Sequence, residues 1–133
     1  MQTESPDNWE PYYQMLERLG IEDPDAPSGV GPGWVPLVER TILRLREIGW
    51  RGEIRQIKEK WGTLRIYVDH DLEATSEEIR RQADRIIAEA ERESGAICEV
   101  CGQPGRTDGP PTGMSGPVLT LCEPHRRVYY YTG

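Results

Sequence analysis

The sequence predicts an α+β fold with a metal-binding region near its C-terminal end. A stretch of alternating apolar residues, typical of a β-hairpin, lies between two stretches with helical periodicity, and all three cysteines lie in the last third of the chain. We expect the two helices to pack on one small antiparallel sheet, formed by residues 53–69. A chain of 133 residues has the size of one main core with a small appended subdomain.

Three segments are expected along the chain. Residues 1–33 would contain an N-terminal helix, capped by Asp7 or Asn8 and ended by Gly20, followed by a Pro/Gly-rich linker. Residues 34–95 would form the α+β core. Residues 96–133 would form the metal-binding subdomain and a tail.

Two amphipathic helices are predicted in the core. Apolar residues recur three and four apart over residues 34–48, and Gly49 would end that helix. A second helix is expected over residues 76–93, with Thr75 and Glu78 as a capping box at its start.

The hairpin is predicted from the alternation of apolar and polar residues in the segment between the two helices. Apolar and polar residues alternate strictly from Leu64 to Val68, and the turn is expected within residues 60–63. Ile54 and Ile57 are three residues apart, which breaks the period of two, so we expect a bulge or a strand end there.

A C-x-x-C pair and a C-x-x-H pair predict one zinc site in the C-terminal region. Thiolate and imidazole groups are the usual ligands of tetrahedral zinc, and four protein ligands describe a closed structural site. A short strand, residues 118–121, would deliver the second pair to a zinc-knuckle, ribbon-like or treble-clef-like subdomain. Three unrelated buried thiols, or a redox-active C-x-x-C, are the alternatives. The predicted ligands are Cys98, Cys101, Cys122 and His125.

Other charged residues give weaker signals. Arg106, Arg126 and Arg127 lie near the ligands in sequence, where they would offset the negative charge of three thiolates or, alternatively, contact phosphate. His70 lies between two aspartates, a setting that suggests acid/base catalysis, with a solvated loop residue as the alternative.

The segment Lys58-Glu-Lys-Trp-Gly-Thr-Leu-Arg-Ile-Tyr67, together with the CExCG and TLCxxH segments, resembles a known group of sequences. This group consists of small, mostly uncharacterised bacterial and phage-encoded proteins with a KEKFGxLRFY segment before a CExCG and TLCxxH pair. Trp61 stands where that group has Phe. The resemblance covers residues 33–127 and implies a bacterial or phage origin and zinc binding, but no activity.

Charge and composition favour a binding protein over an enzyme. The net charge is -7, but residues 51–65 carry five basic and two acidic side chains. We expect a non-enzymatic, zinc-stabilised protein that engages a macromolecular partner, and the acidic balance favours a protein partner. It would be of an immunity-like or antitoxin-like kind, in which an acidic helix docks on a basic toxin. The expected partner contacts on the hairpin are Lys58, Lys60, Trp61, Arg65 and Tyr67.

Two other function classes stay open. A nucleic-acid-binding accessory protein would use the basic hairpin and the arginines near the zinc ligands to contact phosphates. A zinc hydrolase would require a metal with an open position. The sequence has no apolar run long enough to cross a bilayer, its N-terminus is acidic, and its number of cysteines is odd. From these three features we expect a cytoplasmic location.

Overall fold

The computed structural model describes residues 5–22 and 28–131. Residues 23–27 of the predicted linker, residues 1–4, and residues 132–133 of the predicted tail lie outside the described residues. The elements are α1 (Glu10–Leu19), the 3-10 helix η1 (Pro32–Trp34), α2 (Val35–Glu47), β1 (Gly52–Lys60), β2 (Thr63–His70), α3 (Glu77–Ser94), β3 (Arg106–Asp108), β4 (Leu119–Leu121) and α4 (Glu123–Tyr131). The predicted α+β class is confirmed.

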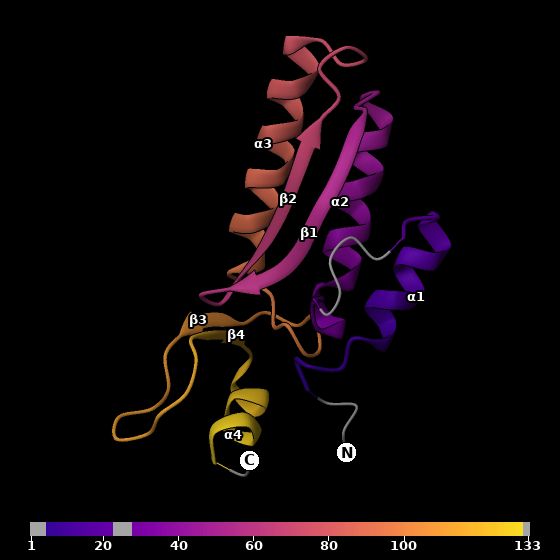
Figure 1. Cartoon of the computed structure of the whole chain (residues 1–133). Helices are drawn as coiled ribbons and strands as arrows, with labels where there is room; N and C mark the ends of the chain where they lie inside the picture. The colour runs from indigo at the N-terminus through magenta and orange to yellow at the C-terminus, as the bar shows by residue number, and fades with distance from the viewer. Residues whose placement is uncertain (1–4, 23–27, 132–133) are drawn as a thin grey trace.

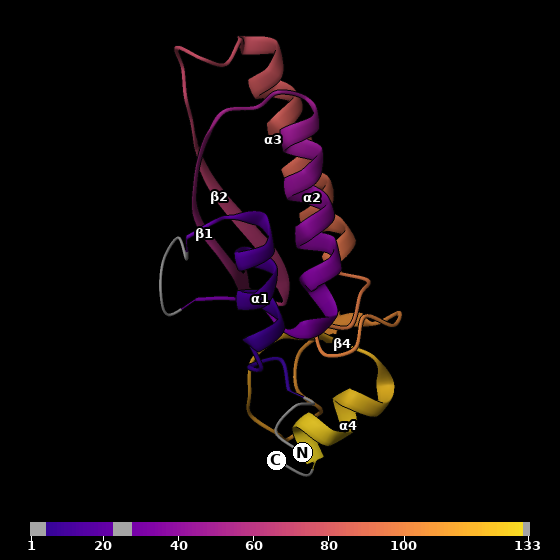
Figure 2. The same cartoon turned by 90° about the vertical axis from the view of Figure 1, so that its right-hand side faces the viewer.

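The elements form two stacked parts. Helices α2 and α3 lie side by side against one face of the antiparallel β1–β2 hairpin, and α1 packs beside α2 (Figures 1 and 2). The short β3–β4 ribbon and α4 lie at the turn end of the hairpin (Figure 1). None of the helices in the described part of the chain is long and apolar enough to span a membrane.

One apolar core joins the N-terminal helix to the predicted α+β core. Helix α1 buries Tyr12, Met15 and Leu16 in this core, and η1 contributes the fully buried Trp34. The domain boundary predicted at residue 33 stays a prediction, but the core crosses it. The cluster contains Tyr12, Met15, Leu16, Val30, Trp34, Val35, Leu37, Val38, Ile42, Ile57, Leu64, Ile66 and Ala90.

The hairpin has the register that the alternation predicted. Lys60 pairs with Thr63 across a two-residue turn, and the register shifts between Ile54 and Gln56, which confirms the predicted bulge. Inward side chains of both strands enter the core. The free edge of β2 is closed near the turn, because the backbone N–H of Leu64 donates to the hydroxyl of Ser94 on α3 at 2.8 Å.

The helix starts differ from the predicted ones. Ser76, one residue after Thr75, caps α3, and its hydroxyl accepts a hydrogen bond from the Ile79 N–H at 3.2 Å. The Thr75 hydroxyl instead donates to the Arg51 carbonyl at 2.9 Å, which ties the loop to the start of β1. The N-cap residue of α1 is Trp9, whose side chain makes no capping hydrogen bond. Of the two predicted caps, Asn8 does contact the start of the helix, because its Oδ1 accepts a hydrogen bond from the Glu10 N–H at 3.4 Å.

The second half of the predicted linker is packed structure. The backbone N–H of Gly33 donates to the carbonyl of Glu99 at 2.7 Å, and the Trp34 indole N–H donates to the carbonyl of Ile97 at 2.7 Å. A Cβ atom added at Gly33 would lie 2.0 Å from the Cys98 carbonyl oxygen. The backbone that carries the first cysteine pair therefore lies directly on residues 31–34.

Replacing Gly33 by Ala should separate these two segments. Because the added methyl group would overlap backbone atoms that cannot rotate away, we expect the free energy of unfolding to fall by about 3 kcal/mol, measured by urea denaturation. Gly109→Ala is the matched control, since its Cβ would have nothing nearer than Val118 at 4.0 Å. Equal stabilities for the two variants would contradict this packing.

Candidate metal centre

Two short segments bring the four predicted ligands together. Cys98 and Cys101 lie in the loop after α3, where the Gly102 N–H donates to the Cys98 carbonyl at 2.9 Å and closes a tight turn. Cys122 follows β4 directly, and His125 lies in the first turn of α4. The two residues of each pair therefore lie within one turn of the backbone, and their side chains reach the same group of ligand atoms.

The candidate ligand atoms lie close enough together to surround one metal ion. All four lie within 4.8 Å of one another. Cys101 Sγ is 3.7 Å from Cys122 Sγ, and His125 Nδ1 is 3.1 Å from Cys122 Sγ and 3.8 Å from Cys98 Sγ. Ligands at about 2.3 Å for sulfur and about 2.0 Å for nitrogen would be roughly 3.5 to 3.8 Å apart in a tetrahedron. These four side chains could bind a metal ion, as the sequence predicted.

The two cysteines of the loop differ in their surroundings. Burial raises the pKa of the Cys98 thiol, but backbone N–H groups of Cys122, Cys101 and Val100 oppose it, and the net pKa is lowered. Burial raises the pKa of Cys101 to about 11, and hydrogen bonding with the neighbouring cysteine thiols adds to this. A bound metal cation would supply the positive charge that stabilises these sulfurs as thiolates.

The buried Glu99 was not predicted as part of the site. Its Oε2 accepts a hydrogen bond from the Gly31 N–H at 3.0 Å, while its Oε1 is buried without a hydrogen-bond partner among the described residues. Burial raises the pKa of this carboxyl group to about 8; the Gly31 hydrogen bond opposes the shift, and the charges of Glu59 and Asp7 add to it. A residue between two cysteines gives no sequence signal of such burial.

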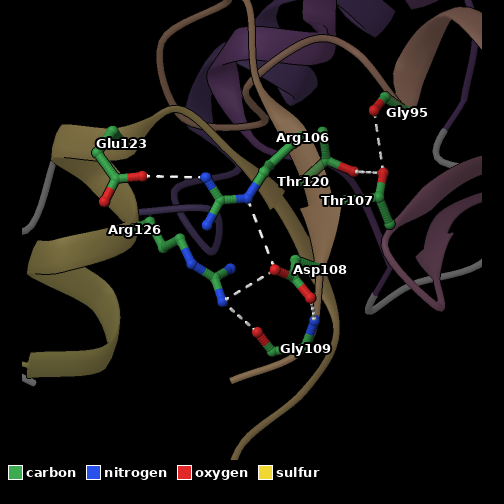
Figure 3. A network of polar contacts seen from close by, with 8 residues as sticks. All are labelled: Gly95, Arg106, Thr107, Asp108, Gly109, Thr120, Glu123 and Arg126. Carbon is green, nitrogen blue, oxygen red and sulfur yellow. Dashed lines mark hydrogen bonds and ion pairs between the residues drawn. The ribbon is translucent and has the colours of Figure 1, made fainter. Parts of the chain in front are cut away.

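The three arginines predicted to offset thiolate charge have other partners. Arg106 forms ion pairs with Glu123 at 3.2 Å and with Asp108 at 3.6 Å, and the buried Arg126 lies 3.6 Å from Asp108 (Figure 3). Arg127 pairs with Glu123 at 3.8 Å. The contacts hold the β3–β4 ribbon to α4, so these side chains serve the packing of the metal-binding region.

The hairpin turn is fastened to the β3–β4 ribbon. The Thr120 hydroxyl donates to the Gly62 carbonyl at 2.6 Å. It also lies 2.5 Å from the Thr107 hydroxyl, which donates to the Gly95 carbonyl at 3.0 Å (Figure 3). Thr120 is fully buried between the hairpin and the ribbon. The strand that leads to Cys122 therefore also positions the turn at Gly62.

The predicted partner contacts lie on one hairpin. Lys58 is directly opposite Arg65, and Lys60 is opposite Thr63. Trp61 at the turn is 71% exposed and Tyr67 is 42% exposed. The Arg65 side chain is only 29% exposed and pairs with Glu91 of α3 at 3.2 Å, so it is the least available of the five.

His70 lies at the end of β2, away from the cysteines. The Trp50 indole N–H donates to His70 Nδ1 at 2.8 Å, and His70 Nε2 lies 3.0 Å from the carboxylate of Asp84. Because an indole only donates, Nδ1 is the acceptor and the ring proton on Nε2 points to Asp84. Both ring nitrogens are engaged, and the predicted alternative of a solvated loop residue is wrong.

Comparison of this chain with family models, curated proteins and solved structures gave no match. The resemblance drawn from the two sequence segments therefore stays a prediction.

Metal binding is testable by ligand replacement. Zinc or cobalt(II) should bind with one equivalent per chain, and His125→Ala should weaken binding by at least about tenfold because a ligand is lost. His70→Ala, which replaces the other histidine of the chain, should keep full stoichiometry. Titration followed by cobalt absorption measures both variants, and unchanged affinity in His125→Ala would contradict the assignment.

Proposed function

We propose that this chain is a non-enzymatic, zinc-stabilised binding protein that engages a protein partner through the exposed side of its β1–β2 hairpin. The metal-binding region would be a treble-clef-like zinc module, with a C-x-x-C loop, a short ribbon and a helix that carries the last ligand. In this proposal the zinc fixes structure and the hairpin makes the contact.

Zinc is supported as the metal by the donor set. Three thiolates and one imidazole suit zinc, whereas calcium and magnesium prefer oxygen ligands. Four protein ligands leave no position for a substrate or a catalytic water, which supports a structural role. The His70 hydrogen bonds to Trp50 and Asp84 also leave that ring without a free nitrogen for catalysis.

Trp61 is the observation that carries the proposal of a binding surface. It is the only non-glycine residue with positive φ among the described residues, with φ of 55°, and the residue is 71% exposed. Such a backbone conformation costs about 1 to 2 kcal/mol for a bulky L-residue. Asn or Gly would fill this turn position more favourably. A large aromatic ring kept in water at a costly position is best explained by contact with a partner.

The turn that presents Trp61 is held rigidly. The Gly62 N–H donates to the Glu59 carboxylate at 2.7 Å, and the Gly62 carbonyl accepts from Thr120 of β4. A contact residue that is already fixed loses little conformational freedom on binding. This arrangement gives the zinc module a role in partner binding, because it holds the base of the turn.

The charges around Trp61 indicate the chemistry of the partner. Neither Lys58 nor Lys60 forms an ion pair within residues 5–22 and 28–131, and both lie on the strand that leads to Trp61. Tyr67 adds a second exposed ring on the same hairpin. We infer a protein surface with an apolar recess for Trp61 and acidic side chains near it. An immunity-like or antitoxin-like inhibitor would then dock through this hairpin on an acidic surface, instead of through the acidic helix on a basic toxin.

Nucleic acid is the second candidate partner. Two lysines without ion pairs beside an exposed indole are also the groups that contact phosphates and stack on unpaired bases. The net charge of -7 opposes this candidate. Binding to single-stranded DNA or RNA that weakens steeply with salt, and that is lost in a Trp61 variant, would favour it over a protein partner.

A substitution to Asn at position 61 should stabilise the free protein. Trp61→Asn relieves the left-handed backbone cost, so we expect the free energy of unfolding to rise by about 1 kcal/mol, measured by urea denaturation. If the indole were instead needed to fold the chain, the same variant would be less stable than the native sequence.

The same variant should lose its partner. We expect the tagged native chain, isolated from its source and examined by native mass spectrometry, to carry a bound protein that Trp61→Asn does not carry. Leu72→Ala is the matched control, because Leu72 is also 71% exposed but lies in the loop after β2, at the other end of the hairpin. Equal recovery with Trp61→Asn and with the native chain would contradict the proposed surface.

A further inference from the structure

The three cysteines of the metal site differ sharply in accessibility. Cys98 is fully buried, Cys101 is exposed, and Cys122 is half-buried. The two accessible sulfurs are also neighbours, since Cys101 Sγ lies 3.7 Å from Cys122 Sγ. Oxidants in solution therefore reach this pair before they reach Cys98.

The neighbouring positions of Cys101 and Cys122 favour one oxidation product. Oxidation of cysteine follows exposure, and a second thiol close to the first favours a disulfide over higher oxidation states. Cys101 and Cys122 are both more exposed than Cys98, and their sulfurs lie 3.7 Å apart, so this pair meets both conditions.

We propose that Cys101 and Cys122 form an oxidation site, at which hydrogen peroxide converts the two metal-ligating sulfurs into a disulfide and releases the metal. This inference rests on the proposed metal ligation, but it does not depend on the hairpin surface or on a partner. The disulfide would thus join the second cysteine of the C-x-x-C motif to a cysteine outside the motif, and not the two cysteines of the motif to each other.

The reaction proceeds in two substitutions at named atoms. The Cys101 thiolate attacks one oxygen of hydrogen peroxide, the O–O bond breaks, hydroxide leaves, and the sulfur becomes a sulfenic acid. The Cys122 thiolate then attacks that sulfur, the S–O bond breaks, and a second hydroxide leaves. Two protons convert the hydroxides into two waters, and two electrons have passed from the sulfurs to one peroxide.

The structure indicates what each bond change does to the fold. The sulfurs must approach from 3.7 Å to about 2.05 Å, the length of a disulfide bond. The metal would keep only Cys98 and His125 as ligands, too few for a stable site. The contacts of residues 31–34 with Ile97 and Glu99 do not involve the oxidised pair, so the loop should stay on the core.

The test uses the full chain loaded with one zinc per chain and treated with hydrogen peroxide. We expect full release of zinc, detected with a chromogenic chelator, together with one Cys101–Cys122 disulfide per chain. Trypsin cleavage after Arg106 separates Cys101 from Cys122, and a glutamate-specific protease that cleaves after Glu99 separates Cys98 from Cys101. Mass spectrometry of the double digest therefore identifies the linked pair. Thiol reductant and added zinc should restore the starting state.

A variant separates the disulfide from general oxidation. Cys101→His keeps four zinc-binding side chains but leaves Cys122 without its neighbouring thiol, so peroxide should release zinc much more slowly. If this variant does not fold, the peptide mapping of the native chain decides the matter alone. A Cys98–Cys101 disulfide, sulfinic or sulfonic acids without a disulfide, or zinc release with no Cys101–Cys122 link would each overturn the inference. Failure to bind zinc at all would instead refute the proposed metal ligation.

Discussion

The structure depends on a close backbone contact between two segments more than sixty residues apart in sequence. The loop that carries Cys98 lies on residues 31–34, where Gly33 leaves no room for a side chain and Trp34 donates to the Ile97 carbonyl. Because this contact joins the main core to the first ligand pair, the metal-binding region is part of one packed body. A metal bound there would therefore stabilise more than the short C-terminal elements.

The same body connects the metal site to the hairpin turn. Cys122 follows β4, and Thr120 of that strand holds the Gly62 carbonyl, one residue from Trp61. The proposed structural zinc and the proposed contact residue are thus linked through one strand and one hydrogen bond. This gives a physical reason for a zinc module in a binding protein, because a rigid turn presents an exposed indole at little further entropic cost.

Much of the fold and the group of four candidate ligands could be predicted from sequence, because both depend on local spacing. Residues that are close in sequence determine the helical periods, the strand alternation, the bulge near Ile54 and the two cysteine-containing motifs. The contact at Gly33 and the burial of Glu99 could not be predicted, since they arise where distant segments meet. The ion pairs of the arginines near the candidate ligands could not be predicted for the same reason, because their carboxylate partners are set by the packing of β3 on α4.

X-ray absorption at the zinc edge of the purified protein measures the ligands of the bound metal. We expect one zinc per chain, with three sulfur neighbours at about 2.3 Å and one nitrogen neighbour at about 2.0 Å. Fewer than three sulfur neighbours, a bound water oxygen as a ligand, or the absence of zinc would rule out the closed four-ligand site.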